Sequence, residues 1–320
     1  MLNRRHIRIK VLQALYAAIQ SEQTDIYLGQ KQLMEKFDKI YDLAIYQLSF
    51  ILELRDFAEN RIEEAKLKHL PTEEDLNPNT KFLNNLLLHQ IAENKDYKRR
   101  ANALAINWST EPDMIRNVYL NVTASELYKE YVAVPQSTYK HDKEFLLGIF
   151  EEIILPHESL HALFAEKNLH WEDDYNLSAE VVMMILASYK EKWEADRAFP
   201  PLFKDDESDE LSQDRAFARD LYKIVLSKRA EYDELIKPKI TNWEIDRLAA
   251  IDRILIHMTL AEVLEMPIIP IKVSMNEYID LSKYFSTPKS KQFINGILDH
   301  IIADLKSEGK INKLGRGLVD

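Results

Sequence analysis

The sequence contains no cysteine and little glycine, and each of these features excludes or disfavours certain kinds of site or fold. Without cysteine the chain can form no disulfide, no Cys-ligated zinc site and no thiol nucleophile, which fits a reducing, cytoplasmic environment. Its 320 residues include 6 glycines, and Leu, Ile, Glu and Lys dominate, a composition that favours helices over sandwiches or barrels. No run of 18 apolar residues occurs, so we expect no membrane-spanning helix.

Acidic residues outnumber basic residues in the whole sequence, yet the first 20 residues carry basic side chains and no acidic ones. The whole sequence has 42 Lys and Arg against 53 Asp and Glu, a formal charge of −11. The first 20 residues hold four basic side chains and no acid, so the remainder sums to −15. A negative body argues against a general polyanion binder, and any nucleic-acid site must therefore be local. The four basic residues are Arg4, Arg5, Arg8 and Lys10.

Hydrophobic periodicity predicts an all-α protein. In the opening segment Ile7, Val11, Leu15 and Ile19 recur every four residues, which is the spacing of one helix face. Two prolines followed by a run of acids interrupt the pattern at 199–211, and we interpret this stretch as an exposed connection. Further helices are expected at about 37–66, 80–93, 112–132, 141–155, 157–168, 177–197, 212–228, 229–237, 244–265, 274–285 and 289–306.

The last two predicted helices meet at the sequence STPKSKQ, and this junction has features of an anion site. We expect Thr287 to cap the last helix with Pro288 at its first position, so that two lysines and free backbone N–H groups share the first turn. The helix dipole also attracts anions to such an end. Gly296 lies further along the same helix, where it costs about 1 kcal/mol relative to alanine. We therefore expect another helix to approach Gly296 closely.

Four stretches resemble the bacterial transcription antitermination factor NusB family, in the order in which that family has them. They are RRHIRIKVLQALYA, WEIDRLAAIDRILIHMTLAEVL, IPIKVSMNEYIDLSKYF and KQFINGILDHI, and they cover roughly residues 3–20 and 212–305. The resemblance implies an all-α fold, a NusB-like pair of small helical bundles, in a protein that is not an enzyme and has no cofactor. We therefore expect a NusB-like domain from 1–20 plus 206–306, an extra inserted helical region at 21–205 and a flexible tail at 307–320.

The resemblance also implies partners and site residues. Members of the family act on the transcription elongation complex by binding boxA-type ribosomal RNA together with the ribosomal protein NusE, and they occur as monomers or homodimers. The starts of the first and last helices form the RNA surface, so the RNA-binding candidates are Arg4, Arg5, Arg8, Lys10, Gln13, Tyr16, Lys289, Ser290, Lys291, Gln292 and Phe293. The helix at 244–265 carries the NusE-facing surface, where the candidates are Asp252, Arg253, His257 and Glu262.

An internal echo at an offset of 72 residues suggests a duplicated helical unit. Residues 142–174 can be laid on residues 214–246 with seven identities in 33 positions. One aspartate and one phenylalanine at the start of each segment are among the identical pairs. Helical periodicity alone also produces such echoes, so duplication is a hypothesis.

Two other functions stay open at the level of sequence. One is a non-catalytic helical protein-interaction module that has lost RNA binding, although the basic opening segment argues against this loss. The other is a zinc hydrolase, because His157-Glu158-x-x-His161 matches the pattern H-E-x-x-H and Glu180 could supply a distant third ligand. This motif is short, and its chance occurrence is common.

Overall fold

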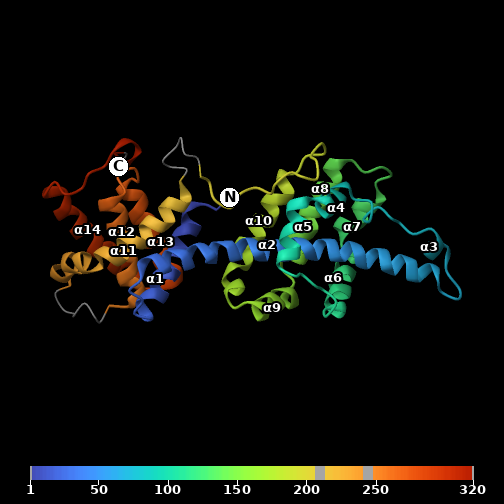
Figure 1. The fold of residues 1–320 in the computed structure, drawn as a ribbon, viewed down its shortest axis with the longest axis horizontal. Coiled ribbons are helices and arrows are strands. Elements are labelled where there is room, and N and C mark those ends of the chain that lie inside the picture. Colours follow the sequence, from blue (N-terminus) through green and yellow to red (C-terminus); the bar gives the residue numbers. More distant parts are fainter. Residues whose placement is uncertain (1, 206–212, 241–247, 319–320) are drawn as a thin grey trace. The chain divides into compact units, whose positions relative to one another are not determined.

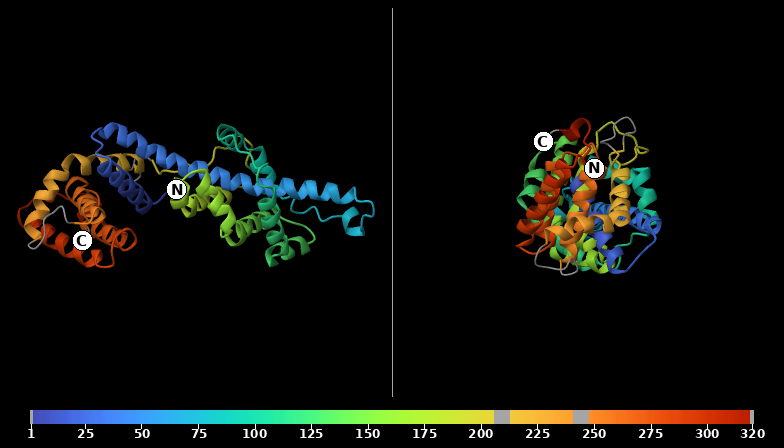
Figure 2. Two further views of the ribbon diagram at one scale, coloured as in Figure 1. Left: turned by 90° about the horizontal axis from the view of Figure 1, so that it is seen from below. Right: turned by 90° about the vertical axis from the view of Figure 1, so that its left-hand side faces the viewer.

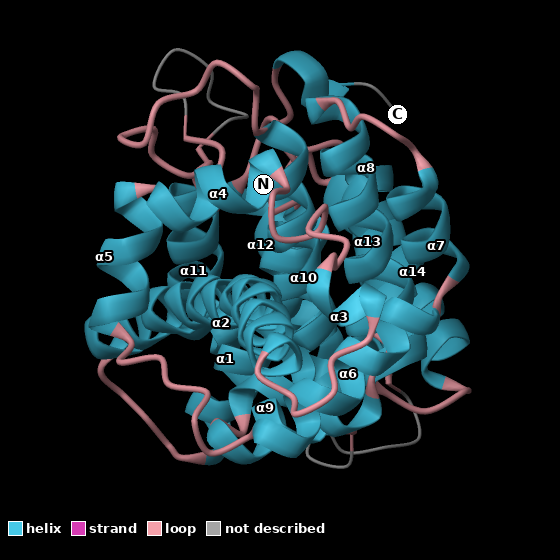
Figure 3. Cartoon of the chain, turned by 90° about the vertical axis from the view of Figure 1, so that its right-hand side faces the viewer, coloured by secondary structure: helices cyan, strands magenta, loops and turns pink. Residues whose placement is uncertain are grey.

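The computed structural model describes residues 2–205, 213–240 and 248–318. In these ranges the chain forms helices joined by loops, and the one β-type pairing is an isolated bridge between Asp205 and Gln213 (Figure 3). The all-α expectation is therefore confirmed. Within the described ranges, no helix combines the length and the apolar character that a membrane span requires.

The chain divides into two compact units. Unit 1 comprises residues 37–202, and unit 2 combines residues 2–36 with residues 203–320. Helix α2 (Ile26–Lys66) is 41 residues long, and its first residues belong to unit 2 (Figure 1). The division thus groups residues 21–36 with the two chain ends, whereas the sequence assigned them to the inserted region.

Unit 1 contains the short and medium-length helices that lie between the two parts of unit 2 in the sequence. The predicted helix at 112–132 is interrupted at Ser125, whose hydroxyl accepts a hydrogen bond from the Tyr128 N–H and so starts a new helix. The helix predicted at 177–197 instead ends at Ser188, because Tyr189 is extended and buried. The helices after α2 are α3 (Glu73–Leu76), α4 (Leu86–Glu93), α5 (Lys95–Ala103), α6 (Pro112–Ala124), α7 (Glu126–Ala133), α8 (Tyr139–Ile149) with a π-helical turn (Phe150–Ile154), α9 (Glu158–Lys167) and α10 (His170–Ser188).

Unit 2 is a helical cluster built around one buried helix. This central helix is α12 (Ala250–Glu265), most of whose side chains are buried, and it packs against all four of the other helices named below. The sequence predicted two helices at 212–228 and 229–237, whereas the structure has one continuous helix. The helices around α12 are α1 (Arg4–Gln20), α11 (Asp214–Ile236), α13 (Ile271–Phe285) and α14 (Ser290–Ser307) (Figures 1 and 2).

The segment that the sequence predicted as a flexible tail makes specific contacts in unit 2. Lys313 Nζ donates hydrogen bonds to the backbone carbonyls of Glu262 and Met266 at the end of α12, both at 3.0 Å. The backbone N–H of Leu314 donates to the carbonyl of Pro267 at 3.0 Å. Burial lowers the pKa of the Lys313 ammonium to about 8. These contacts join the tail to the loop between α12 and α13.

One half of the sequence echo lies in unit 1, where a buried carboxylate begins the repeated segment. Asp142 accepts hydrogen bonds from the Leu86 N–H at 2.8 Å and from the Tyr131 hydroxyl at 2.8 Å. The Tyr131 ring in turn stacks on Phe145, with ring centroids 3.9 Å apart. The aspartate thereby connects the start of α8 to α4 and α7.

The other half of the echo has the same arrangement in unit 2, with a different partner. Asp214 accepts a hydrogen bond from the Lys204 N–H at 3.2 Å and one from Arg4 Nε at 3.3 Å. Arg4 also lies over the ring of Phe217, 4.4 Å from its centroid. An arginine therefore stands where unit 1 uses a tyrosine, and this parallel supports the duplication hypothesis. The end of the echo, including Trp243, lies outside the described residues.

Replacement of two glycines by alanine is expected to change the free energy of unfolding in opposite directions. A Cβ at Gly29 of α2 would lie 2.0 Å from the hydroxyl of Tyr222, which is buried and cannot move aside freely. At Gly296 of α14 a Cβ would meet no atom within 4 Å, so the close helix approach expected from the sequence is wrong. We expect Gly29→Ala to destabilise the protein by about 1–2 kcal/mol and Gly296→Ala to stabilise it by up to about 1 kcal/mol. Urea denaturation of both variants tests this; a Gly29→Ala protein at least as stable as Gly296→Ala would contradict the packing.

Candidate nucleic-acid interface

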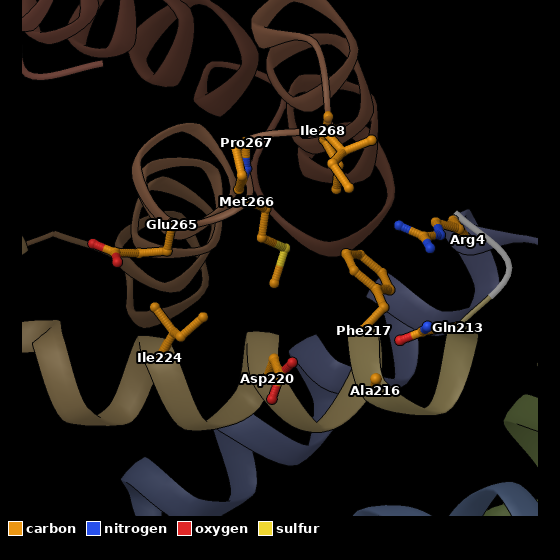
Figure 4. Close-up of a pocket in the computed structure, with 11 residues that line it drawn as sticks. Arg4, Gln213, Ala216, Phe217, Asp220, Ile224, Glu265, Met266, Pro267 and Ile268 are labelled. Atoms are coloured by element: carbon orange, nitrogen blue, oxygen red, sulfur yellow. The ribbon is translucent and has the colours of Figure 1, made fainter. Parts of the chain in front are cut away.

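The three arginines of α1 pair with three different carboxylates, although the sequence grouped them in one surface. Arg4 is partly buried against α11, where it pairs with Asp214 and covers the ring of Phe217. Figure 4 shows its guanidinium beside this ring, at the edge of a cavity of about 210 Å³ between α11 and the loop after α12. Arg4 therefore has a packing role, and less of its charge is available to a ligand.

Arg8 is part of the core of unit 2 and not of its surface. The residue is 3% exposed, and its Nε and Nη2 donate to the two carboxylate oxygens of Glu262 at 2.7 and 3.0 Å. Burial alone would lower the pKa of Arg8, but the charge and hydrogen bonds of Glu262 outweigh burial and raise it. Lys10 is 5% exposed and also buried. Both residues were predicted to contact RNA, and their burial prevents this in the present conformation.

Arg5 is the arginine of α1 that faces outward. Its Nη1 lies 3.7 Å from Asp280 Oδ2 on α13, and both side chains are partly exposed. Gln13 and Tyr16 follow Arg5 at offsets of 8 and 11 residues, which places all three on one side of the helix. At a rise of about 1.5 Å per residue, this side extends for about 16 Å from Arg5 to Tyr16.

The start of α14 differs from the sequence expectation in its first residue. The helix begins at Ser290, so neither Thr287 nor Pro288 holds the predicted capping positions. The reason is tertiary: the hydroxyls of Ser286 and Ser290 both donate to the buried carboxylate of Asp252 on α12, Ser290 at 2.7 Å. This network fixes the turn between α13 and α14. Asp252 was predicted to contact NusE and Ser290 to contact RNA. In the structure the two side chains are hydrogen-bonded to each other inside the protein.

The remaining candidates at the start of α14 stay accessible. Lys289, Lys291 and Gln292 are exposed, and Phe293 is partly exposed. Lys291 lies on the first turn of the helix, and its charge contributes to lowering the pKa of Asp280 on α13. The first turn of α14 and the outward face of α1 therefore approach the same residue of α13.

Asp280 of α13 interacts with one cation from α1 and one from α14. It pairs with Lys283 of its own helix, and a hydrogen bond from Lys283 lowers the pKa of Asp280, with further lowering by the charges of Arg5 and Lys291. Three cations from α1, α13 and α14 thus surround one carboxylate, and we call these four residues the Asp280 cluster. Lys283 is not among the residues predicted from the sequence, although its position three residues after Asp280 on a predicted helix could have indicated it.

The four predicted partner-binding residues lie on α12, and the structure uses them internally. Glu262 binds Arg8, and its carboxylate also accepts hydrogen bonds from the hydroxyls of Ser274 and Tyr278. Asp252 holds the turn before α14. Because α12 is the central helix of unit 2, a partner-facing surface along it would need side chains that the fold has already buried.

The other two partner candidates share one carboxylate on α11. Arg253 Nε and His257 Nε2 each lie 2.9 Å from Asp233 Oδ1. Burial alone would raise the pKa of Asp233, but the hydrogen bonds from His257 and Arg253 lower it overall. His257 is buried, whereas the side chain of Arg253 is 29% exposed. Arg253 is thus the member of the four that a partner can reach.

The H-E-x-x-H motif is divided by a helix boundary. Helix α9 begins at Glu158, so His157 precedes the helix and His161 lies within it. His157 Nδ1 and His161 Nε2 are buried and have no hydrogen-bond partner among the described residues. Throughout the residues that the structure describes, no group of three or more His, Asp or Glu side chains is arranged to hold a metal ion. The zinc hydrolase alternative therefore depends on the sequence motif alone.

Comparison of the sequence with known proteins finds similarity to the NusB family, both with the family model and with individual relatives. The NusB family model matches residues 176–303, which include most of α10, all of α11 to α13 and most of α14, but not α1. The transcription antitermination protein NusB of Salinibacter ruber is 45% identical over 111 residues, 35% of this chain and 69% of the relative. The NusB protein of Chloroherpeton thalassium is 35% identical over 142 residues, 44% of this chain and 67% of the relative. That of Bacillus licheniformis is 42% identical over 91 residues, 28% of this chain and 70% of the relative. No solved structure matches the chain.

Proposed function

The chain belongs to the NusB family, and we propose that it is a transcription antitermination factor that binds boxA-type single-stranded RNA together with NusE. The relatives named above are transcription antitermination proteins. The observation that carries the RNA part of the proposal is the Asp280 cluster, because it brings cations from both ends of an acidic chain to one exposed place.

The chemistry of single-stranded RNA fits this surface. Such RNA needs cations for its phosphates and accessible side chains for its unstacked bases. Arg5, Lys283, Lys289 and Lys291 supply the cations. Side chains that can contact bases lie beside them on α1 and α14, and they are Gln13, Tyr16, Gln292 and Phe293. The negative remainder of the chain repels RNA elsewhere and confines binding to this surface.

The protein partner is proposed from the family resemblance. We assign NusE, within the transcription elongation complex, as that partner, and Arg253 as the α12 residue that contributes to its contact. The buried candidates Asp252, His257 and Glu262 act indirectly in this proposal, because they hold α12 in register with α1, α11 and the turn before α14.

A gel-shift titration of the full chain tests the proposal, with boxA-like RNA and a scrambled RNA of the same composition, each with and without NusE. We expect tighter binding to the boxA-like RNA and a larger preference in the presence of NusE. Equal binding to both RNAs would contradict boxA recognition. Absence of RNA binding together with NusE binding would support a protein-interaction module instead.

The salt dependence of RNA affinity gives a quantitative check. Four cations that each neutralise one phosphate of a single strand predict that log affinity falls with log salt concentration at a slope of about −3. Lys283→Gln should reduce this slope by about 0.7, because one phosphate contact is lost. Fluorescence anisotropy between low and moderate salt measures both values. An unchanged slope in Lys283→Gln would remove Lys283 from the interface.

A further inference from the structure

We propose that Tyr284 is a base-stacking residue of the RNA surface, an inference that rests on the proposed function. Tyr284 is not among the RNA-binding residues that the resemblance to the NusB family implies. Tyr284 lies in the last turn of α13, next to Lys283, and its side chain is among the most exposed aromatic groups of the described chain at 75%.

The position of Tyr284 connects it to the Asp280 cluster. Residues four apart on a helix lie on the same face, so Tyr284 stands one turn beyond Asp280 on the side that approaches Arg5 and Lys291. Among the described residues, none makes a hydrogen bond or a ring contact with Tyr284. The side chain is therefore largely accessible to a ligand.

The surroundings of Tyr284 match what a single-stranded nucleic acid requires. Neighbouring cations hold the backbone, and an accessible aromatic ring provides a platform on which one base stacks. A tyrosine has few rotatable bonds, so ordering it on binding costs little conformational entropy. Tyr284 is the second-to-last residue of α13, and in the sequence it lies between the cations of Lys283 and Lys289.

Exposure alone does not single out Tyr284, because isolated exposed apolar side chains are normal on protein surfaces. Tyr27 shows the contrast: it is 80% exposed at the start of α2, also in unit 2, but its nearest charged neighbour in the sequence is Asp25. Tyr284 differs by its place beside three cations. Tyr27 is therefore a matched control for the loss of an exposed tyrosine.

Substitution of Tyr284 in the full chain tests the inference. We expect Tyr284→Ala to weaken binding of boxA-like RNA by about 5- to 150-fold, the range measured for loss of one stacked base. Tyr284→Phe should retain the affinity, because stacking needs the ring and not the hydroxyl. The salt slope should be the same in wild type and Tyr284→Ala, because no phosphate contact is removed. Tyr27→Ala should bind RNA as the wild type does.

The outcomes separate this inference from the proposed function. If the wild-type chain binds boxA-like RNA and Tyr284→Ala binds it equally well, the stacking role of Tyr284 is wrong and the proposed function stands. If the wild type shows no affinity for RNA, the proposed function itself fails.

In a Tyr284→Trp variant, quenching of the new indole fluorescence on RNA addition would support stacking, provided that the same change at Tyr27 shows no quenching. A lower salt slope in Tyr284→Ala would indicate a backbone contact and overturn stacking.

Discussion

Reversal of two charges, Arg5→Glu with Lys291→Glu, is expected to weaken binding of boxA-like RNA on the order of 100-fold or more. The two side chains come from opposite ends of the chain and share Asp280 as a neighbour. Their replacement removes two phosphate contacts and adds two carboxylates beside a third, which repels the RNA backbone. The salt slope should also decrease in size by about 1.4, the contribution of two phosphates of a single strand.

This double reversal should leave the fold intact. The pair between Arg5 and Asp280 is partly exposed and spans 3.7 Å, and such surface pairs contribute about 0–1 kcal/mol. Helical circular dichroism and urea denaturation of the variant measure this directly. A well-folded variant with unchanged RNA affinity would exclude the Asp280 cluster as the RNA site.

A matched control uses two exposed lysines of the same unit. Lys31 on α2 and Lys223 on α11 lie outside the Asp280 cluster, and Lys31→Glu with Lys223→Glu changes the net charge by the same amount. We expect this control to lose much less affinity than the double reversal. Equal losses in both variants would mean that overall charge, and not the local cluster, controls binding.

Removal of one buried charge, Arg8→Ala, is expected to destabilise the protein by about 3–5 kcal/mol. The substitution leaves the carboxylate of Glu262 buried, with two hydroxyl donors in place of a bidentate guanidinium. A loss of this size is a large fraction of the total stability of a typical domain, about 5–15 kcal/mol. Urea denaturation with helical circular dichroism measures it, and a loss below about 1 kcal/mol would contradict a buried charged pair.

A second variant separates the buried charge from the loss of packing. Arg8→Met with Glu262→Gln removes both charges, fills similar volume and keeps an acceptor for the hydroxyls of Ser274 and Tyr278. We expect it to be more stable than Arg8→Ala, because no charge is left unpaired. If its RNA affinity is normal once folded, the role of Arg8 is structural; a specific loss of affinity in a stable variant would return Arg8 to the interface.

The helical class and most helix positions could be predicted from the sequence, because both depend on local patterns. The apolar stripe of α1 and the Gly- and Pro-poor runs each indicate a helix without reference to the rest of the chain. Helix ends were less predictable. The start of α14 moved to Ser290 because a buried aspartate from α12 binds the serines of the preceding turn, and this contact is absent from the local sequence.

The candidate site was predictable only in part, because the exposure of a charged side chain depends on what packs against it. Arg4, Arg5 and Arg8 are equivalent in composition, yet they face α11, the exterior and the core respectively. Helical geometry turns each residue by about 100° from the one before it, so Arg4 and Arg5 face different directions, whereas Arg4 and Arg8 share a face and differ in how deeply they are buried. Lys283 and Tyr284 were missed because the pairing of their helix with α1, through Asp280 and Arg5, is a tertiary contact.

By itself, the sequence determined the all-helical class, the family and the excess of basic residues at the start of an acidic chain, since each of these properties can be read from residue types in order. Only the tertiary structure decided which cations reach solvent, because α12 recruits Arg8 to neutralise the buried Glu262 while α13 and α14 bring Lys283 and Lys291 to the side of Arg5. A buried carboxylate requires a partner, and the packing of distant helices determines which cation supplies it.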